Sequence, residues 1–110
     1  MAAIIPKLLF IGNTQSGFIY AVPNSEGNYA IIKSVNVCNT SSSPQTFSIN
    51  LVESGSSISP SNAVLGNIVM SANNVFSYET SIVMPAGSSL HIDQPETSLT
   101  FTISGVEYVV

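Results

Sequence analysis

The side chains that could do chemistry are few, and they begin with a single histidine. His91 stands two residues before Asp93 in a stretch whose alternation of apolar and polar residues predicts a strand. A histidine and a carboxylate can act as base and orienting group in a hydrolase, but a triad also needs a nucleophile that converges on them. Residues two apart on a strand share one face and form a solvent-exposed pair. This spacing therefore indicates no triad, and we expect no enzymatic activity.

The carboxylates are spread along the chain without the spacing of a metal site or of a glycosidase pair. Most fall in expected turns or at strand ends, where a solvated carboxylate is the default. They are Glu26, Glu53, Glu79, Asp93, Glu96 and Glu107. The one cysteine, Cys38, cannot form an internal disulfide, and we expect it to be a small buried strand residue. The sequence predicts no catalytic residue, no metal ligand and no cofactor.

Composition excludes two classes of partner. Charged residues make up 7% of the 110 residues, the net charge is −4, and the only basic residues are Lys7 and Lys33. Nucleic acids and anionic membranes are bound by clusters of Lys and Arg, so we expect the chain to bind neither. The chain has no apolar run of about 18 residues that could span a membrane, and its start lacks a secretory signal. Its surface is expected to carry uncharged Ser, Thr and Asn residues. Such a surface can face water, or it can be buried against neighbouring subunits, because burying a hydroxyl costs less than burying a charge.

Strands are the elements that must position these side chains. Residues 29–52 predict two strands that pair across the turn formers of residues 39–44. In the second strand Phe47, Ile49 and Leu51 alternate with polar residues, as in a strand with one buried face. In the first strand the expected inward residues share their face with Lys33; they are Ile31, Val35 and Val37.

Further strands are expected at intervals of about 8 to 12 residues. They are residues 8–11, 18–22, 63–70, 75–78, 81–84, 88–92 and 99–103, with a short helix as the alternative over 63–70. The fold class is all-β, an antiparallel β-sandwich of about seven or eight strands with jelly-roll or Ig-like connections, in one domain over residues 1–110. We expect one core between the sheets, made of Phe47, Ile49, Leu51, Leu99, Phe101 and Ile103.

Residues 1–11 form an apolar arm that contains the first strand. Pro6 divides it into an outer piece, residues 2–5, and an inner strand, residues 8–11. Either the two termini pair as neighbouring strands, or the arm adds to an adjacent subunit. We favour the second account for part of the arm. The candidate interface residues are therefore Ile4, Ile5, Leu8, Leu9 and Phe10.

Several short motifs follow one another along the chain in a fixed order. Tyr-Ala-Val-Pro at residues 20–23 precedes Ile-Ile-Lys-Ser-Val-Asn-Val-Cys-Asn-Thr at residues 31–40. Ala-Asn-Asn at residues 72–74 and Met-Pro-Ala-Gly at residues 84–87 come next, and Leu-Thr-Phe-Thr-Ile-Ser-Gly-Val-Glu at residues 99–107 is the last. In this order the motifs resemble a family of small virion structural proteins of tailed bacteriophages, and the resemblance covers residues 17–107.

The resemblance implies a non-enzymatic virion protein made in the cytoplasm of a bacterial host. We expect a capsid decoration (cement) protein that binds the major capsid protein or other virion proteins and forms a homo-oligomer, with a trimer as the expected state. A tail, neck or baseplate component is the second hypothesis. A host-receptor or carbohydrate-binding module is the third, since four tyrosines could line a sugar-binding face. Those tyrosines lie in four separate segments, which favours core and interface roles for Tyr20, Tyr29, Tyr78 and Tyr108.

Overall fold

The computed structural model describes residues 3–13, 15–94 and 98–110, with the backbone alone for residues 3–5 and 16. Within these residues the chain forms eight strands and a single 3-10 turn, η1 (Pro60–Asn62). The strands are β1 (Ala3–Gly12), β2 (Ser16–Ala21), β3 (Tyr29–Asn39), β4 (Gln45–Val52), β5 (Ala63–Met70), β6 (Asn74–Pro85), β7 (Ser89–Asp93) and β8 (Leu99–Val109). Residues 1–2 of the arm and part of the turn expected at residues 93–96 lie outside the described residues.

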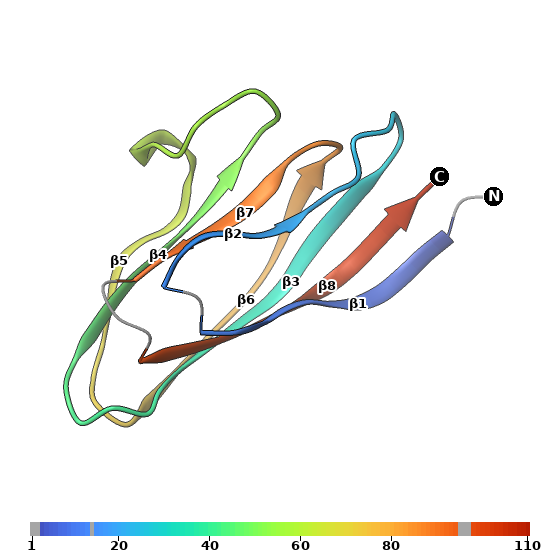
Figure 1. Cartoon of the computed structure of the whole chain (residues 1–110). Coiled ribbons are helices and arrows are strands. Elements are labelled where there is room, and N and C mark those ends of the chain that lie inside the picture. Colours follow the sequence, from blue (N-terminus) through green and yellow to red (C-terminus); the bar gives the residue numbers. More distant parts are fainter. Residues whose placement is uncertain (1–2, 14, 95–97) are drawn as a thin grey trace.

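The strands form two four-stranded sheets, the β1 sheet in the order β1-β8-β3-β6 and the β2 sheet in the order β2-β7-β4-β5 (Figure 1). The antiparallel pairs β1–β8, β2–β7, β3–β6 and β4–β5 show a chain that folds back on itself at its middle. Pairing of β3 with β8 and of β4 with β7 then rolls this ribbon into two layers. This is the jelly-roll connection. The all-β antiparallel sandwich is confirmed, and its connections are jelly-roll, not Ig-like.

The pairing expected between the two strands of residues 29–52 is wrong, because β3 and β4 lie in opposite sheets. The turn between them is a crossing from one layer to the other. Asn39, which is buried, holds this crossing: its Nδ2 donates to the carbonyl oxygens of Ser43 at 3.0 Å and Ser71 at 3.1 Å. Ser71 follows β5, so one amide joins the two connections that cross at this end of the sandwich.

The inward face of β3 also differs from the expectation. A β-bulge in the pairing of β3 with β8, between Ile32 and Ser34, makes Lys33 an extra residue in β3. The bulge shifts the alternation by one position, so that Ile32 points into the core and Ile31 points outward. Lys33 therefore stays exposed without interrupting the buried series, and Val35 and Val37 are buried as expected.

The core lies between the sheets and contains the residues expected there. Phe47, Ile49, Leu99, Phe101 and Ile103 are buried, and Leu51 packs against them half-buried. The ring of Phe47 meets Phe101 edge to face, with centroids 5.3 Å apart. It meets Phe76 of β6 in the same way at 5.9 Å. These contacts join β4 of one sheet to β8 and β6 of the other.

Strand assignment is confirmed for residues 63–70, which form β5, and β6 runs unbroken through both of its expected segments. The turn after β6 closes through Ser88 N–H, which donates to the Pro85 carbonyl at 3.1 Å. Gly87 has a φ of 78° in this turn, a backbone conformation that favours glycine.

The N-terminal strand continues through Pro6. β1 pairs with β8 from Ala3 opposite Val109 to Gly12 opposite Phe101. Because β1 is the edge of its sheet, the missing N–H of Pro6 removes no bond between inner strands. The two termini therefore pair with each other, which is the account that we did not favour for residues 3–5.

Candidate functional site

The outer face of the β1 sheet carries cross-strand rows of uncharged side chains. One row contains Val83, Ile31, Val106 and Pro6, which are successive partners across β6, β3, β8 and β1. In the adjacent row Tyr29 pairs with Tyr108, and their rings stack with centroids 5.0 Å apart. We call these six residues the apolar end of the sheet.

Beyond the apolar end, the same face becomes polar but stays almost uncharged. Ser34 and Ser104 share a hydrogen bond of 2.8 Å between their hydroxyl oxygens. In the next row Ser77 Oγ donates to Asn36 Oδ1 at 2.7 Å. The charged side chains on the described part of this face are Lys33 and Glu79, both exposed. Such a face can be covered at little cost in desolvated charge.

The candidate interface residues of the arm separate into two groups. Leu8 is 52% exposed and stands beside the apolar end, opposite Ser104. Leu9 is buried in the core of the same chain, since it lies on the same face of β1 as Lys7. The bulge between Leu8 and Phe10 then places Phe10 opposite the buried Ile103, and Phe10 packs against that core. Ile4 and Ile5 pair with Tyr108 and Glu107 of β8. Their side chains lie outside what the structure describes.

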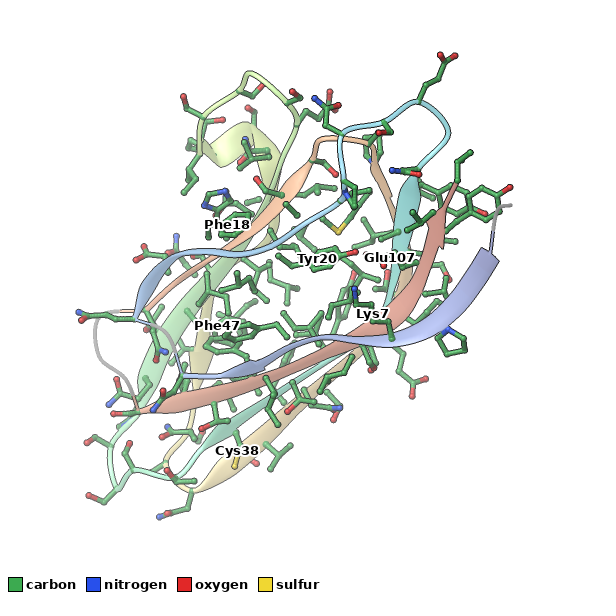
Figure 2. All side chains as sticks on the ribbon, turned by 45° about the vertical axis from the view of Figure 1, so that its right-hand side comes forward. Lys7, Phe18, Tyr20, Cys38, Phe47 and Glu107 are labelled. Carbon is green, nitrogen blue, oxygen red and sulfur yellow. The ribbon has the colours of Figure 1, made fainter. Side chains whose placement is uncertain are left out.

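Sequence reasoning missed a charged cluster between the two sheets, formed by Lys7, Tyr20 and Glu107 (Figure 2). Lys7 Nζ donates to Glu107 Oε1 at 3.0 Å, and the Tyr20 hydroxyl donates to Glu107 Oε2. Lys7 Nζ also lies 5.7 Å from the centre of the Tyr20 ring. Glu107 is 8% exposed, although we expected a solvated carboxylate. The signal was its position in β8, on the face of Leu99, Phe101 and Ile103.

Hydrogen bonding sets the electrostatics of this cluster. The Tyr20 hydrogen bond lowers the pKa of Glu107; the bond and charge of Lys7 lower it further, against the opposing effect of burial. Burial raises the pKa of Tyr20, and the hydrogen bond and the charge of Glu107 add to that increase. Glu107 is thus held as a carboxylate and Tyr20 as a neutral phenol, which indicates a structural clamp between β1, β8 and β2.

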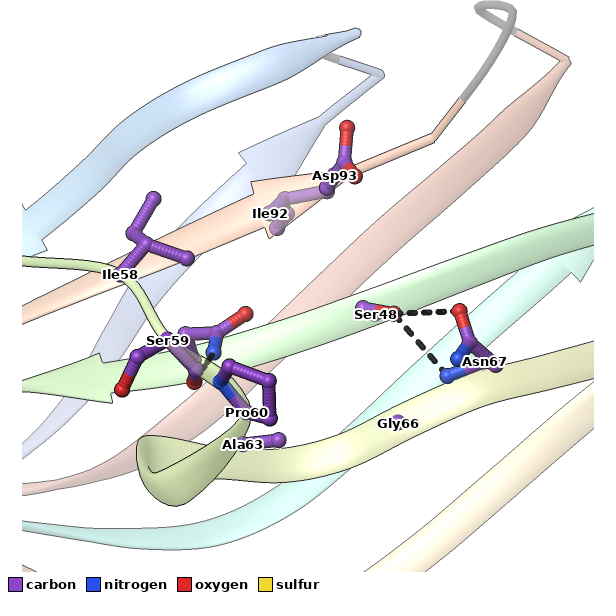
Figure 3. A pocket seen from close by; sticks show the side chains of 10 residues that line it. Ser48, Ile58, Ser59, Pro60, Ala63, Gly66, Asn67, Ile92 and Asp93 are labelled. Carbon is purple, nitrogen blue, oxygen red and sulfur yellow. Dashed lines mark hydrogen bonds between the residues drawn. The ribbon is translucent and has the colours of Figure 1, made fainter.

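An open groove of about 630 Å³ lies on the outer face of the β2 sheet (Figure 3). Strands β4 and β7 form its floor, β5 forms one wall, and the loop before η1 forms another. Asn50 fixes that loop, because its Nδ2 donates to Ser59 O at 3.1 Å and to Asn62 Oδ1 at 2.8 Å. The residues that line the groove are Ser48, Asn50, Ile58, Ser59, Pro60, Ala63, Gly66, Asn67, Ile92 and Asp93.

His91 and Asp93 both point outward on β7, and the side-chain contacts of His91 are with two other residues. His91 Nε2 lies 3.0 Å from Ser89 Oγ, and its ring meets Phe18 edge-on with centroids 6.0 Å apart. Asp93 is exposed and lines the groove. Cys38 is partly exposed on the outer face of β3 and not buried as expected, because it alternates with Val37, which points inward.

The described residues contain no group of three or more His, Cys, Asp and Glu side chains that could hold a metal ion. Over that same part of the chain, no helix has the length and apolar character to cross a membrane. The four tyrosines do not gather on one face, since Tyr20 is buried and Tyr78 stacks on Phe76 with ring centroids 6.5 Å apart.

No protein-family model and no curated protein matches the sequence. Solved structures of infectious bursal disease virus share its fold. The matched chain in a crystal structure of the T13 viral particle has 12% sequence identity to this chain. The TM-score is 0.55, and the match covers 98% of this chain and 30% of the viral one. A structure of the Gx strain is 14% identical, with a TM-score of 0.53 over 98% of this chain and 31% of the viral one.

The coat protein of tobacco streak virus is also matched, at 8% identity and a TM-score of 0.40 over 99% of this chain and 86% of that one. The chain spans about a third of the length of the two bursal disease virus chains. The likeness to those two structures shows the fold alone. The described residues form an eight-stranded jelly roll, and a similar fold is present in a viral particle.

Proposed function

We propose that the chain is a non-enzymatic structural protein of a virion, and that it decorates the capsid of a tailed bacteriophage as a cement protein. The observation that carries this proposal is the outer face of the β1 sheet, where uncharged side chains from four strands form one continuous surface. The jelly-roll fold supports it, since viral particles are among the structures matched. A fold alone does not determine function, so the main support for a role in a particle is this surface.

The apolar end of the sheet has the composition of the centre of a protein interface. Such centres are depleted in charge and enriched in aromatic residues. Each aliphatic side chain that becomes fully buried contributes up to about 1.5–3 kcal/mol, before the costs of association are subtracted. The stacked pair of Tyr29 and Tyr108 is already ordered in the chain, which reduces those costs. The partner we propose is the major capsid protein or another virion protein, with the chain itself as a trimer.

A charged substitution in the apolar end tests the proposal. Val83 is 57% exposed on the edge strand β6, so Val83→Asp should leave the chain folded but place an unpaired charge in the interface. Val69 is 70% exposed on β5, the edge strand of the other sheet, and Val69→Asp is the matched control. We expect only Val83→Asp to lower the amount of chain bound to purified particles. Equal binding by the two folded variants would overturn the proposal.

Two alternatives have distinct outcomes. A tail, neck or baseplate component would use the same face, and cryo-imaging of particles would place the chain away from the shell. An enzyme would depend on His91, the one histidine. We expect His91→Ala to leave particle binding unchanged. Loss of a hydrolytic activity on host polysaccharide after that substitution would contradict a purely structural role.

A further inference from the structure

We infer that the groove on the outer face of the β2 sheet binds a neutral sugar residue. This inference goes beyond the proposed role in a particle and does not depend on it, because the groove lies on the opposite sheet from the apolar end. Its volume of about 630 Å³ falls within the range of about 300–1,000 Å³ that is usual for small-ligand sites.

The polar side of the groove offers hydrogen-bonding groups that are already held in place. Ser48 and Asp93 are direct partners across β4 and β7. Ser48 Oγ accepts a hydrogen bond from Asn67 N–H at 2.9 Å, which fixes the wall opposite the loop. The loop uses both hydrogens of Asn50 Nδ2, so its Oδ1 is the acceptor that this amide can offer a ligand. Hydroxyl, amide and carboxylate groups together match the donors and acceptors of a polyhydroxylated ligand.

The opposite side of the groove is apolar. Ile58 is the one large apolar residue of its loop, and it is 54% exposed at the groove (Figure 3). The loop is held by the amide of Asn50, so the exposed side chain of Ile58 is not needed to anchor it. Pro60 and Ala63 continue this side. A sugar ring has a face of C–H groups and a rim of hydroxyls, so one apolar wall beside one polar wall suits it.

The charges around the groove favour a neutral sugar over an anionic ligand. The chain has two basic residues, Lys7 and Lys33, and both lie on strands of the β1 sheet. The charged side chain at the groove is Asp93, which would repel phosphate or an acidic sugar. A carboxylate that accepts hydrogen bonds from hydroxyl groups forms the stronger, charge-assisted kind. Asp93 is therefore the residue from which we expect the largest contribution to binding.

One strained backbone position lies at the wall of the groove. Asn67 has a φ of 51° within β5, in the left-handed region that costs a non-glycine residue free energy. Its position coincides with an irregularity in the pairing of β4 with β5, where residues 66 and 67 have no partner opposite Ser48. At this irregularity the Asn67 backbone N–H points at the Ser48 hydroxyl and not at the backbone of β4.

The test is an NMR titration of the isotope-labelled chain with glucose, galactose and N-acetylglucosamine, each added separately. We expect at least one of these sugars to shift the backbone signals of residues 48, 67 and 93 and to leave those of the apolar end unchanged. Asp93→Asn should weaken that binding about tenfold or more, since a hydrogen bond to a charged group is lost. Glu79→Gln, an exposed carboxylate on the other sheet, is the matched control and should bind like the unaltered chain.

A second variant blocks the groove without removing its hydrogen-bonding groups. Ala63 is exposed on β5, so Ala63→Phe should fold normally while its ring fills the space between the two walls. We expect it to abolish the shifts. Absence of localised shifts with all three sugars would overturn the inference, as would full binding by folded Asp93→Asn and Ala63→Phe. Shifts at the groove with N-acetylneuraminic acid alone would also overturn it, since that probe is anionic. None of these results bears on particle binding by Val83→Asp.

Discussion

The Tyr20 hydroxyl of one sheet donates a hydrogen bond to the Glu107 carboxylate of the other, at the edge where β1 and β2 face each other (Figure 2). Lys7 supplies the second contact of that carboxylate from the edge strand β1. The three side chains therefore connect both sheets and the paired termini. Because all are polar, the clamp depends on protonation in a way that the apolar core does not.

The clamp makes stability depend on pH. The pKa of Glu107 is below its ordinary value of 4.5 in the folded chain, so the unfolded chain binds the proton more readily. Glu107 therefore stabilises the fold above about pH 4.5, and this contribution is lost as pH falls through the lower, folded pKa. We expect the free energy of unfolding in urea to decrease between neutral pH and about pH 3, and to decrease less in Glu107→Gln.

Glu79→Gln is the control for that measurement, because Glu79 is exposed on the β1 sheet. Its urea curves should follow those of the unaltered chain over the whole range. The clamp would have no part in acid stability if Glu107→Gln lost as much free energy on acidification as the unaltered chain does.

The aromatic core supplies a larger and pH-independent contribution. Phe101 is fully buried and meets Phe47 across the sheets. Phe101→Ala should lower the free energy of unfolding by about 3–5 kcal/mol through lost burial and a residual cavity. A small domain has a total of about 5–15 kcal/mol, so a thermal melt should show a large decrease. An unchanged melt would be incompatible with the position of β8 in the sandwich.

Gly105 is required by close approach of two backbones. A Cβ atom at this position would clash with the carbonyl oxygen of Ile31, beside the bulge in β3. Gly105→Ala should therefore destabilise the chain by about 1–3 kcal/mol or more, since β3 must move. Gly66→Ala is the control, because its Cβ would meet only Ala63 Cβ at 3.8 Å. Equal melting temperatures for the two variants would contradict the register of β3 and β8.

The sequence predicted those features that depend on alternation within one strand. The inward series of β4 and β8 follows directly from period two. The buried position of Glu107 follows from the same alternation, but we expected a solvated carboxylate there. Sheet partners could not be predicted in the same way, because the residues that pair are up to about a hundred positions apart and the pattern of one strand does not name its partner. Residues 29–52 were assigned to one hairpin for this reason, whereas Asn39 holds a crossing between layers.

Bulges were the second obstacle. A single extra residue at Lys33 exchanges the faces of Ile31 and Ile32, and another at Leu9 brings Phe10, a candidate interface residue, against the core. The groove was not predicted at all. It arises where the polar loop before η1 returns to the outer face of β4 through Asn50, a contact that no local pattern contains.

Deletion of residues 1–5 tests the interface assigned to the arm. The backbone of residues 3–5 pairs with the end of β8, so the deletion exposes strand edge opposite Glu107 and Tyr108. Lys7 remains to bind Glu107, and Leu9 remains in the core. We therefore expect a folded chain with a lower melting temperature. This chain should bind particles poorly, because Ile4 and Ile5 are missing and Leu8 lies at the end of a shortened edge strand. Leu8→Ser should weaken binding with little effect on folding, since Leu8 is 52% exposed. Particle binding equal to that of the full chain by both variants would remove the arm from the interface and leave the apolar end to act without it.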